Sequence, residues 1–396
     1  MSRLWEKGTA VDAAVLEFTV GDDVTLDARL VGHDCTASVA HARMLARCGY
    51  LSTEDAERLA VALSDLAAEH AQGQWSILPQ QEDCHTAIEA HLTMRLGDLG
   101  QRIHLGRSRN DQVLTAMRLY LRAEAEEMRN LAAAASNAFN ALVVRQGNLS
   151  IPGYTHLQRA MPSTVADWAG AHAAELMHSA DTLDALSGLW NLCPLGSAAG
   201  YGTPGLVLDR VWVAEELGFA SPQEPVTAVQ LSRGKAESAF AFACTLLQGD
   251  LSRAASDLVL FATTEYGFVT LDPAFTTGSS IMPQKRNPDV FELIRAHATQ
   301  ANADLAAIQA LTTRLSSGYF RDLQLMKAPL FRCIDRTKAC LSIAAHALGG
   351  VRFNPATLDH AMTPDLYAAE RAYALVQGEG ISFREAYRRV AAKLNL

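Results

Sequence analysis

The sequence lacks the features that would mark a secreted, membrane-spanning or disulfide-bonded protein. Its seven cysteines are scattered and no C-x-x-C spacing occurs, so we expect reduced thiols and no disulfide framework. No uninterrupted apolar run reaches the roughly 18 residues that a membrane-spanning helix needs. Residues 1–18 have neither the apolar segment nor the small-residue cleavage site of a signal peptide. Together these absences predict a cytoplasmic protein with no membrane partner.

Positive charge is also scarce. Lysine and arginine number 34 against 43 aspartates and glutamates, which gives a formal net charge of −9. This balance argues against a protein that binds nucleic acid electrostatically, although one pocket could still hold an anionic small molecule. The chain also has no low-complexity segment, no linker rich in glycine and serine, and no visible internal repeat.

The common catalytic and cofactor motifs are missing too. There is no G-x-S-x-G, P-loop, H-E-x-x-H or EF-hand pattern. The stretch 200–205, GYGTPG, has the form G-x-G-x-x-G, but no clear strand precedes it and Pro204 interrupts it, so we reject a dinucleotide site. His85 and Glu89 lie one helical turn apart, yet no third ligand is apparent, and we expect no metal site.

What the sequence does have is helical periodicity. Apolar residues recur every three or four positions in the stretches 111–146, 240–261 and 294–311, as on one face of a helix. Such long stripes are typical of helices packed side by side in a bundle. No run of alternating β-branched residues competes with them, and a chain of 396 residues is too long for one core. We therefore predict an all-α fold with domains at 1–107, 108–355 and 356–396.

One break between the helices has an unusual composition. The stretch 277–288, TGSSIMPQKRNP, combines hydroxyls, two cations and an amide just before a predicted helix that begins at Pro288. Asn287 can cap that helix, and the free N–H groups of its first turn, with Lys285 nearby, would suit a carboxylate or a developing negative charge. Gly278 would let the loop hinge as a lid does. A capped helix behind an ordinary surface loop explains the composition equally well.

Two further polar breaks are ambiguous when taken singly. Residues 107–111, RSRND, crowd the start of a long helix, where arginines could pair with carboxylates, but a capped helix with a solvated charged start is the simpler interpretation. The break 151–162, IPGYTHLQRAMP, places Thr155 beside His156, a natural proton carrier near neutral pH. A lone histidine is more often structural, although the neighbours of this one could bind a polar ligand.

In this order, the breaks resemble the motifs of the aspartase/fumarase superfamily of lyases and, within it, of the argininosuccinate lyases. GSSIMPQKRNP is similar to the mobile loop of the superfamily, in the PQK form typical of argininosuccinate lyases. GRSRNDQV and PGYTHLQRAMP are similar to two other motifs of that subfamily. The resemblance extends over nearly the whole chain through AHARML, EDCHTAIE, PLGSAAGYG and GYFRDLQLMK.

This resemblance implies an all-α, three-domain fold with a central long-helix bundle. Four copies of the chain would form a homotetramer around a twenty-helix core, and each active site would take one motif from each of three subunits. It also implies the cleavage of argininosuccinate to arginine and fumarate in arginine biosynthesis, with no cofactor and no metal. The implied partners are the small-molecule substrate and further copies of the chain.

Matched positions then imply roles. Ser279, acting as an alkoxide, would take a proton from the succinyl carbon, while Lys285 and the helix N-terminus stabilise that alkoxide and the aci-carboxylate intermediate. His156, paired with Glu292, would protonate the departing nitrogen, or would instead orient the substrate or a water. The matched substrate-binding residues are Ser108, Asn110, Thr155, Asn287, Tyr319, Gln324 and Lys327.

Two segments depart from the family pattern. Residues 19–27, TVGDDVTLD, are longer and more acidic than the short N-x-S stretch that is common there, and residues 226–235 read VTAVQLSRGK where N-S-x-D-A…R-D is frequent. Both belong near the amino-acid end of the site, so the leaving group could differ. One alternative is a fumarate-releasing lyase that acts on a modified N-substituted aspartate. Another is a crystallin-like structural protein, which the retained catalytic residues argue against.

Overall fold

The computed structural model describes residues 12–394, which form two compact units. Unit 1 contains the described residues up to Glu127 together with Leu183–Phe242 and Ala303–Ile334. Unit 2 contains Met128–Thr182, Ala243–Asn302 and the described residues from Asp335 on. The boundaries expected at 107 and 355 divide the chain at polar breaks and not by contacts, and they stay predictions.

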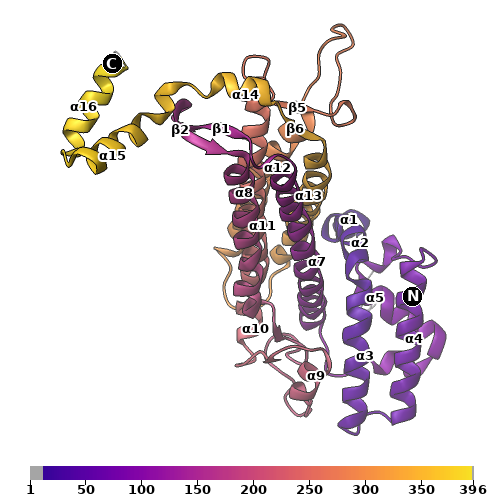
Figure 1. Ribbon diagram of the computed structural model, residues 1–396. Helices are drawn as coiled ribbons and strands as arrows, with labels where there is room; N and C mark the ends of the chain where they lie inside the picture. The colour runs from indigo at the N-terminus through magenta and orange to yellow at the C-terminus, as the bar shows by residue number, and fades with distance from the viewer. Residues whose placement is uncertain (1–11, 395–396) are drawn as a thin grey trace. The chain divides into compact units, whose positions relative to one another are not determined.

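Most of the described chain is helical, as predicted (Figure 1). The long helices are α7 (Arg109–Gln146), α8 (Val165–Leu186), α11 (Lys235–Phe261), α12 (Asp289–Thr312) and α13 (Lys327–Ala347). Unit 1 also has the shorter α1 (Ala13–Val20), α2 (Asp23–Asp27), α3 (Val31–Arg47), α4 (Thr53–Ala71), α5 (Cys84–Leu96), α6 (Asp98–Arg102), α9 (Arg210–Glu216) and α10 (Ala228–Leu231). Unit 2 ends with α14 (Pro355–Ala361), α15 (Ala368–Glu379) and α16 (Phe383–Lys393).

In unit 1, α3 and α4 lie side by side (Figure 1). The side chain of Ser52 caps α4 by accepting a hydrogen bond from the N–H of Asp55 at 3.0 Å. Leu59, Leu63 and Leu66 recur three or four residues apart and are fully buried, so one stripe of α4 faces its neighbours. The buried leucine stripe of α4 thus holds it against α3.

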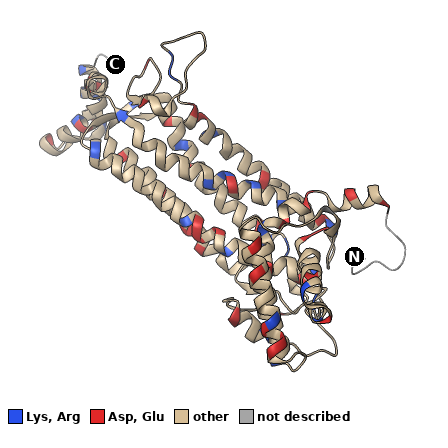
Figure 2. Cartoon of the chain, turned by 90° about the vertical axis from the view of Figure 1, so that its right-hand side faces the viewer, with Lys and Arg blue, Asp and Glu red and all other residues tan. Residues whose placement is uncertain are grey.

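The long helices bury the apolar stripes that the periodicity predicts. On α11, each apolar residue of the predicted stripe is buried, from Phe240 to Phe261. In unit 2, the hydroxyl of Ser136 on α7 donates to the carbonyl of Ala173 on α8 at 3.0 Å. The indole N–H of Trp168 on α8 donates to Asp257 on α11 at 2.9 Å. Figure 2 shows charged residues of both signs at intervals along the helices.

Three small two-stranded sheets accompany the helices, and the sequence did not predict them. In unit 2, β1 (Ser150–Thr155) pairs antiparallel with β2 (Gln158–Thr164), and β5 (Val269–Leu271) pairs antiparallel with β6 (Val351–Phe353). In unit 1, β3 (Leu192–Cys193) pairs parallel with β4 (Ser221–Pro222). The turn of the β1–β2 hairpin carries His156, the predicted acid.

The start of α12 differs slightly from the prediction. The helix begins at Asp289, and the carbonyl of Pro288 accepts hydrogen bonds from the N–H groups of Phe291 and Glu292. Asn287 pairs with Thr277 instead: each backbone N–H donates to the other's carbonyl, and the Asn287 amide donates to the Thr277 hydroxyl. Asn287 therefore closes the base of the 277–287 loop and does not form the predicted helix cap.

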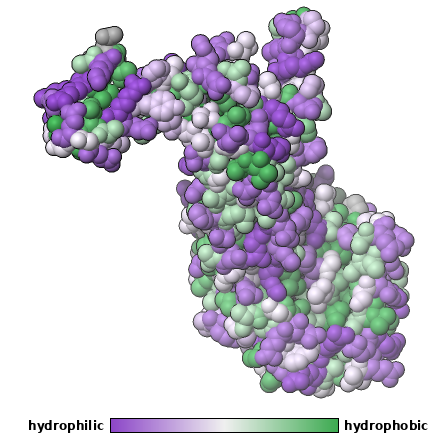
Figure 3. Space-filling view, viewed as in Figure 1, coloured by the Kyte–Doolittle hydropathy of each residue, from purple (hydrophilic) through white to green (hydrophobic). Residues whose placement is uncertain are grey.

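Three further observations concern the helices and the cysteines. None of the helices in residues 12–394 is long and apolar enough to cross a membrane. In unit 2, α15 and α16 pack on a small cluster formed by Ala372, Ala386 and Val390. Figure 3 shows hydrophobic surface between hydrophilic neighbours on this hairpin of helices. All seven cysteines are free, and six of them are buried.

Candidate active site

The start of α7 is built around a buried carboxylate. Asp111 accepts hydrogen bonds from the N–H groups of Ser108 at 3.0 Å, Gly196 at 3.0 Å and Ala198 at 2.8 Å. Burial raises the pKa of Asp111 to about 6, although these N–H donors oppose the shift. Asp111 thereby ties the loop at 196–198 to the residues in front of α7 and fixes the position of Ser108.

A pocket of about 460 Å³ opens in unit 1 beside these residues, within the usual range for small-molecule sites. Five of the seven predicted substrate-binding residues line it, although they come from two distant stretches of the chain: Ser108, Asn110, Tyr319, Gln324 and Lys327. The remaining lining residues are mostly charged: Asp23, Asp27, Glu82, Asp83, His85, His104, Arg107, Arg109, Val113, Arg233 and Arg321.

Arg107, just before α7, and Arg109, its first residue, are both paired with carboxylates, so the interpretation as a solvated charged start is wrong. Arg107 is buried and donates to the hydroxyl of Ser38 at 2.9 Å and to Asp34 at 3.4 Å. Arg109 lies 2.7 Å from Asp83 and donates to Glu82 at 3.2 Å. Because these carboxylates come from α3 and from the segment before α5, the two arginines hold three parts of unit 1 around the pocket.

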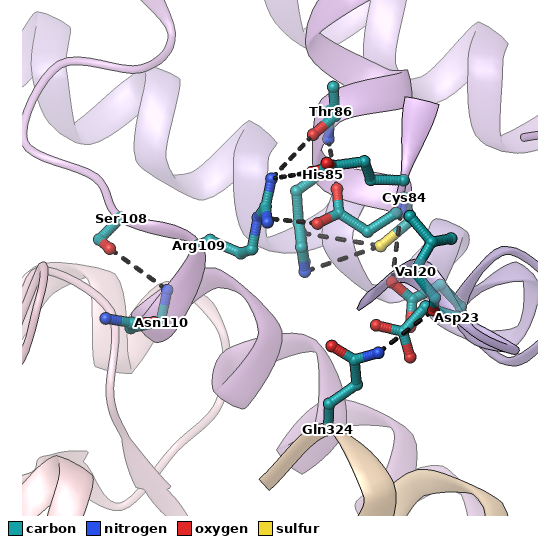
Figure 4. A network of polar contacts seen from close by, with 12 residues as sticks. Val20, Asp23, Cys84, His85, Thr86, Ser108, Arg109, Asn110 and Gln324 are labelled. Atoms are coloured by element: carbon teal, nitrogen blue, oxygen red, sulfur yellow. Dashed lines mark hydrogen bonds and ion pairs between the residues drawn. The ribbon is translucent and has the colours of Figure 1, made fainter. Parts of the chain in front are cut away.

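Behind the pocket lies a buried ion pair between two helices. Nδ1 of His85 on α5 lies 3.0 Å from Oδ2 of Asp34 on α3. Burial opposes both charges, but each group stabilises the other, so the pKa of His85 is raised and the pKa of Asp34 is lowered. Glu89, one helical turn after His85 on α5, pairs with His104 at 3.0 Å. Figure 4 shows the other neighbours of these elements: His85 lies beside Cys84, and Arg109 reaches Thr86.

The acidic segment 19–27 contacts the predicted substrate-binding residues directly. Nζ of Lys327 lies 2.6 Å from Oδ1 of Asp27 and 2.8 Å from Oδ1 of Asp23. The amide of Gln324 donates to the carbonyls of Thr19 at 3.1 Å and Val20 at 3.2 Å (Figure 4). The segment that departs from the family pattern therefore forms part of the pocket wall.

Two carboxylates on one buried ammonium set the charges in this wall. Burial would lower the pKa of Lys327, but Asp27 and Asp23 raise it above its ordinary value, so the ammonium stays charged. Burial raises the pKa of Asp23 to about 6, even though Lys327 opposes this shift. Two carboxylates therefore share one ammonium in this wall.

In unit 2, His156 lies in a strained turn. His156 has φ 53° and Leu157 has φ 59°, and these two residues form the whole connection between β1 and β2. Positive φ at both central positions is the geometry of a type I′ hairpin turn, which favours glycine and asparagine. Both residues are exposed, as is Thr155 before them. Strain that persists in an exposed histidine is a hint of function.

The 277–287 loop in unit 2 surrounds the Ser279 hydroxyl with amides. Oγ of Ser279 accepts hydrogen bonds from the N–H groups of Ile281 at 3.3 Å and Met282 at 3.2 Å. The sequence predicts backbone N–H donors at the N-terminus of α12, whereas these two donors belong to the loop itself. Lys285, in the same loop, is exposed, as is Glu292 in the first turn of α12. Across residues 12–394, no hydrogen bond or ion pair joins Ser279 to Lys285, or His156 to Glu292.

Comparison with known proteins agrees with the motifs. A family model described as "Lyase" matches residues 7–302. An argininosuccinate lyase of Sorangium cellulosum (strain So ce56) is 46% identical over 392 residues, which cover 99% of this chain and 90% of that protein. The chain belongs to the argininosuccinate lyase family.

Solved structures place the fold of this argininosuccinate lyase family member in a wider group. An EDDS lyase in complex with formate is 26% identical, with a TM-score of 0.80 over 97% of this chain and 76% of that chain. A class II fumarase from Schistosoma mansoni is 16% identical, with a TM-score of 0.78 over 96% of this chain and 91% of that chain. The all-α fold predicted from the sequence, the aspartase/fumarase type, is thereby confirmed.

Sequence reasoning missed several residues that line this pocket. Asp23, Asp27 and Arg233 line the pocket from the two segments that depart from the family pattern. A usable signal existed, because acidic residues and an arginine near an expected site are candidates for charge recognition. Their partners could not be found in this way, since Lys327 lies far from both segments in the sequence.

Proposed function

We propose that this chain is an argininosuccinate lyase that cleaves argininosuccinate to arginine and fumarate by β-elimination, in cytoplasmic arginine biosynthesis. The observation that carries the proposal is the shared pocket of Ser108, Asn110, Tyr319, Gln324 and Lys327. The elimination breaks one carbon–nitrogen bond and moves two protons without net oxidation or reduction. It therefore requires a base, an acid and groups that stabilise negative charge, all of which protein residues can supply.

In this proposal Ser279 is the base. Its hydroxyl would have to lose a proton first, and an alkoxide is stabilised by donors that are already in place. The N–H groups of Ile281 and Met282 supply two such donors, and Lys285 supplies a positive charge on the same loop. The alkoxide takes the proton from the succinyl carbon, and the electron pair moves into the neighbouring carboxylate to form the aci-carboxylate.

His156 is the proposed acid. When the carbon–nitrogen bond breaks, the electron pair returns from the aci-carboxylate and the departing guanidinium nitrogen gains a proton. An exposed imidazole at the tip of the β1–β2 turn can approach a substrate without being hindered by its own helix bundle. Glu292 would hold the imidazole in its orientation once both side chains reach the same site. Thr155 and Asn287 complete the proposed substrate contacts.

We propose that the site is assembled by a homotetramer. Thr155, His156, Lys285 and Glu292 are exposed in the single chain, as expected for residues that complete a site on other copies. The alternative functions differ in what they predict. A related lyase would use a different N-substituted aspartate, and a crystallin-like structural protein would cleave none.

The test is a substrate panel followed by fumarate release. Purified wild-type protein should raise the absorbance of the fumarate band, near roughly 240 nm, with argininosuccinate and not with adenylosuccinate or aspartate. Ser279→Ala should lower kcat by about 10²–10⁴-fold, the usual contribution of a general base. Ser280→Ala, one residue along the same exposed stretch, is the matched control and should leave kcat unchanged. Activity with adenylosuccinate or aspartate alone would refute the proposal.

A further inference from the structure

Arg233 is a pocket residue with an unusual environment. It follows α10 and lines the pocket in unit 1. Its guanidinium carbon lies 5.6 Å from the ring centroid of Tyr319, a proposed substrate-binding residue. Its Nε and Nη1 atoms are buried, and neither has a hydrogen-bond partner within residues 12–394. A buried guanidinium with unused donors is costly, which suggests that a ligand completes its hydrogen bonds.

Three other cations of the pocket are already paired with carboxylates. Arg107 pairs with Asp34, Arg109 with Asp83, and Lys327 with two carboxylates. Arg233, in contrast, has no acidic side chain within ion-pair distance in the described chain. Arg321 also lines the pocket without an acidic partner, but it donates to Gln324 and to the carbonyl of Thr19. A carboxylate that enters this pocket therefore meets buried donors without a hydrogen-bond partner at Arg233, and a guanidinium can present parallel N–H groups to two carboxylate oxygens.

Glu237 and Arg118 are the neighbouring charged groups. Oε2 of Glu237 accepts a hydrogen bond from the N–H of Gly234 at 2.8 Å, so this carboxylate is bound to the start of α11. Arg118 donates to the carbonyl of Leu192 and to the hydroxyl of Ser232. Burial lowers the pKa of Arg118 to about 10, and the positive charge of Arg233 contributes to that shift. Neither Glu237 nor Arg118 forms a hydrogen bond or an ion pair with Arg233 within residues 12–394.

The charges across the pocket indicate which end of the substrate enters. Asp23 and Asp27 share the single ammonium of Lys327, which leaves net negative charge on that wall. The succinyl end of argininosuccinate has two carboxylates and no free ammonium group, so this wall would repel it. The amino-acid end has one ammonium and one carboxylate, and a pocket with both an acidic wall and a free guanidinium fits that pair.

We propose that Arg233 binds the α-carboxylate of the arginine half of argininosuccinate and selects leaving groups that carry it. This inference rests on the proposed lyase function. Stacking on Tyr319 holds the planar guanidinium in place, so that the carboxylate meets an oriented fork. The acidic wall at Asp23 and Asp27 faces the ammonium of the same substrate end. Arg233 is thus a specificity-determining residue for the leaving group.

The test compares two substrates that differ only in this carboxylate: argininosuccinate and its decarboxylated analogue, N-succinylated agmatine. The variants are Arg233→Ala and Arg233→Lys, with Arg58→Ala, an exposed arginine of α4, as the control. Wild-type protein should prefer argininosuccinate. Arg233→Ala should raise KM for argininosuccinate by roughly 30-fold or more and should change kcat/KM for the analogue little, because the lost partner is absent there. Arg233→Lys should restore part of the preference.

The ratio of the two kcat/KM values is measured within one protein sample, so a partly unfolded variant does not disturb it. Equal losses for both substrates, or no loss for either, would overturn the role of Arg233 while leaving the lyase function intact. A wild-type protein that releases fumarate from neither substrate would overturn the proposed function itself.

Discussion

The Nζ atom of Lys327 lies 2.6 Å from Oδ1 of Asp27, and this contact joins the first turn of α13 to the end of α2. Asp23 adds a second carboxylate at 2.8 Å. All three side chains are buried. The acidic segment that looked like a departure from the family pattern is thus what holds a proposed substrate-binding lysine in position. The proposed substrate contact of Lys327 therefore depends on an ion-pair cluster that also stabilises the fold.

Replacing Lys327 should therefore lower the free energy of unfolding. Lys327→Met leaves Asp23 and Asp27 buried without their cation, and such an uncompensated charge costs about 3–5 kcal/mol. The free energy of unfolding, from urea titration at neutral pH, should fall by that order. The double variant Lys327→Met with Asp27→Asn removes one of the stranded charges and should recover part of the loss. A double variant that is less stable than the single one would contradict this account.

The pH dependence of stability should show the raised pKa of Asp23. The folded-state pKa is about 6 against an ordinary 3.8, so between these values the folded chain holds a proton that the unfolded chain has released. Raising the pH through this window therefore lowers the free energy of unfolding of the wild type, by about 3 kcal/mol from this group.

Asp23→Asn removes that titration. The stability of this variant relative to the wild type should increase from pH 4 to pH 6 and then level off, as measured by urea titration at each pH. Asp22→Asn, at the exposed neighbouring acid, is the control and should show no such relative change. A constant difference between Asp23→Asn and wild type across the window would show that Asp23 titrates normally.

The sequence predicts the helices well because their signal is local. The stripe from Phe240 to Phe261 repeats every three or four residues, and that period reports directly which face of α11 is buried. The pocket wall is different, since Asp27 and Lys327 are brought together only by folding. Neither residue type nor spacing shows that contact in advance.

The local geometry of the proposed catalytic residues was also hidden from the sequence. The sequence predicts a polar break around His156. It does not predict a two-residue turn within THLQ, because the glycine or asparagine usual in such a turn is missing. In the loop at Ser279, the sequence shows the hydroxyl itself but not the groups that donate to it. The donors that reach it come from Ile281 and Met282, whose side chains are apolar, and backbone amides of apolar residues leave no mark in a motif.

The proposed three-subunit site predicts that inactive variants can complement each other. Ser279→Ala and His156→Ala each remove one catalytic group, and both should be inactive alone. If one site takes Ser279 and His156 from different subunits, some sites in a mixed tetramer contain two variant groups and others contain none. Mixing after mild denaturation and refolding should thus restore a fraction of the fumarate release. Mixed tetramers, verified by mass, that stay inactive would refute the shared site.

The turn at His156 allows backbone strain and proton transfer to be separated. A non-glycine residue in the left-handed region costs of the order of 1–3 kcal/mol, and both His156 and Leu157 are there. Leu157→Gly should relieve part of this strain, raise the free energy of unfolding by about 1 kcal/mol and keep the activity, because the imidazole remains.

His156→Asn should also be at least as stable as wild type, since asparagine tolerates this backbone, but should lose about 10²–10⁴-fold in kcat. Thermal unfolding and fumarate release measured on the same samples give both quantities. Full activity in His156→Asn would remove the imidazole from the mechanism, whereas a loss of stability in both variants would show that contacts of these side chains outweigh the strain.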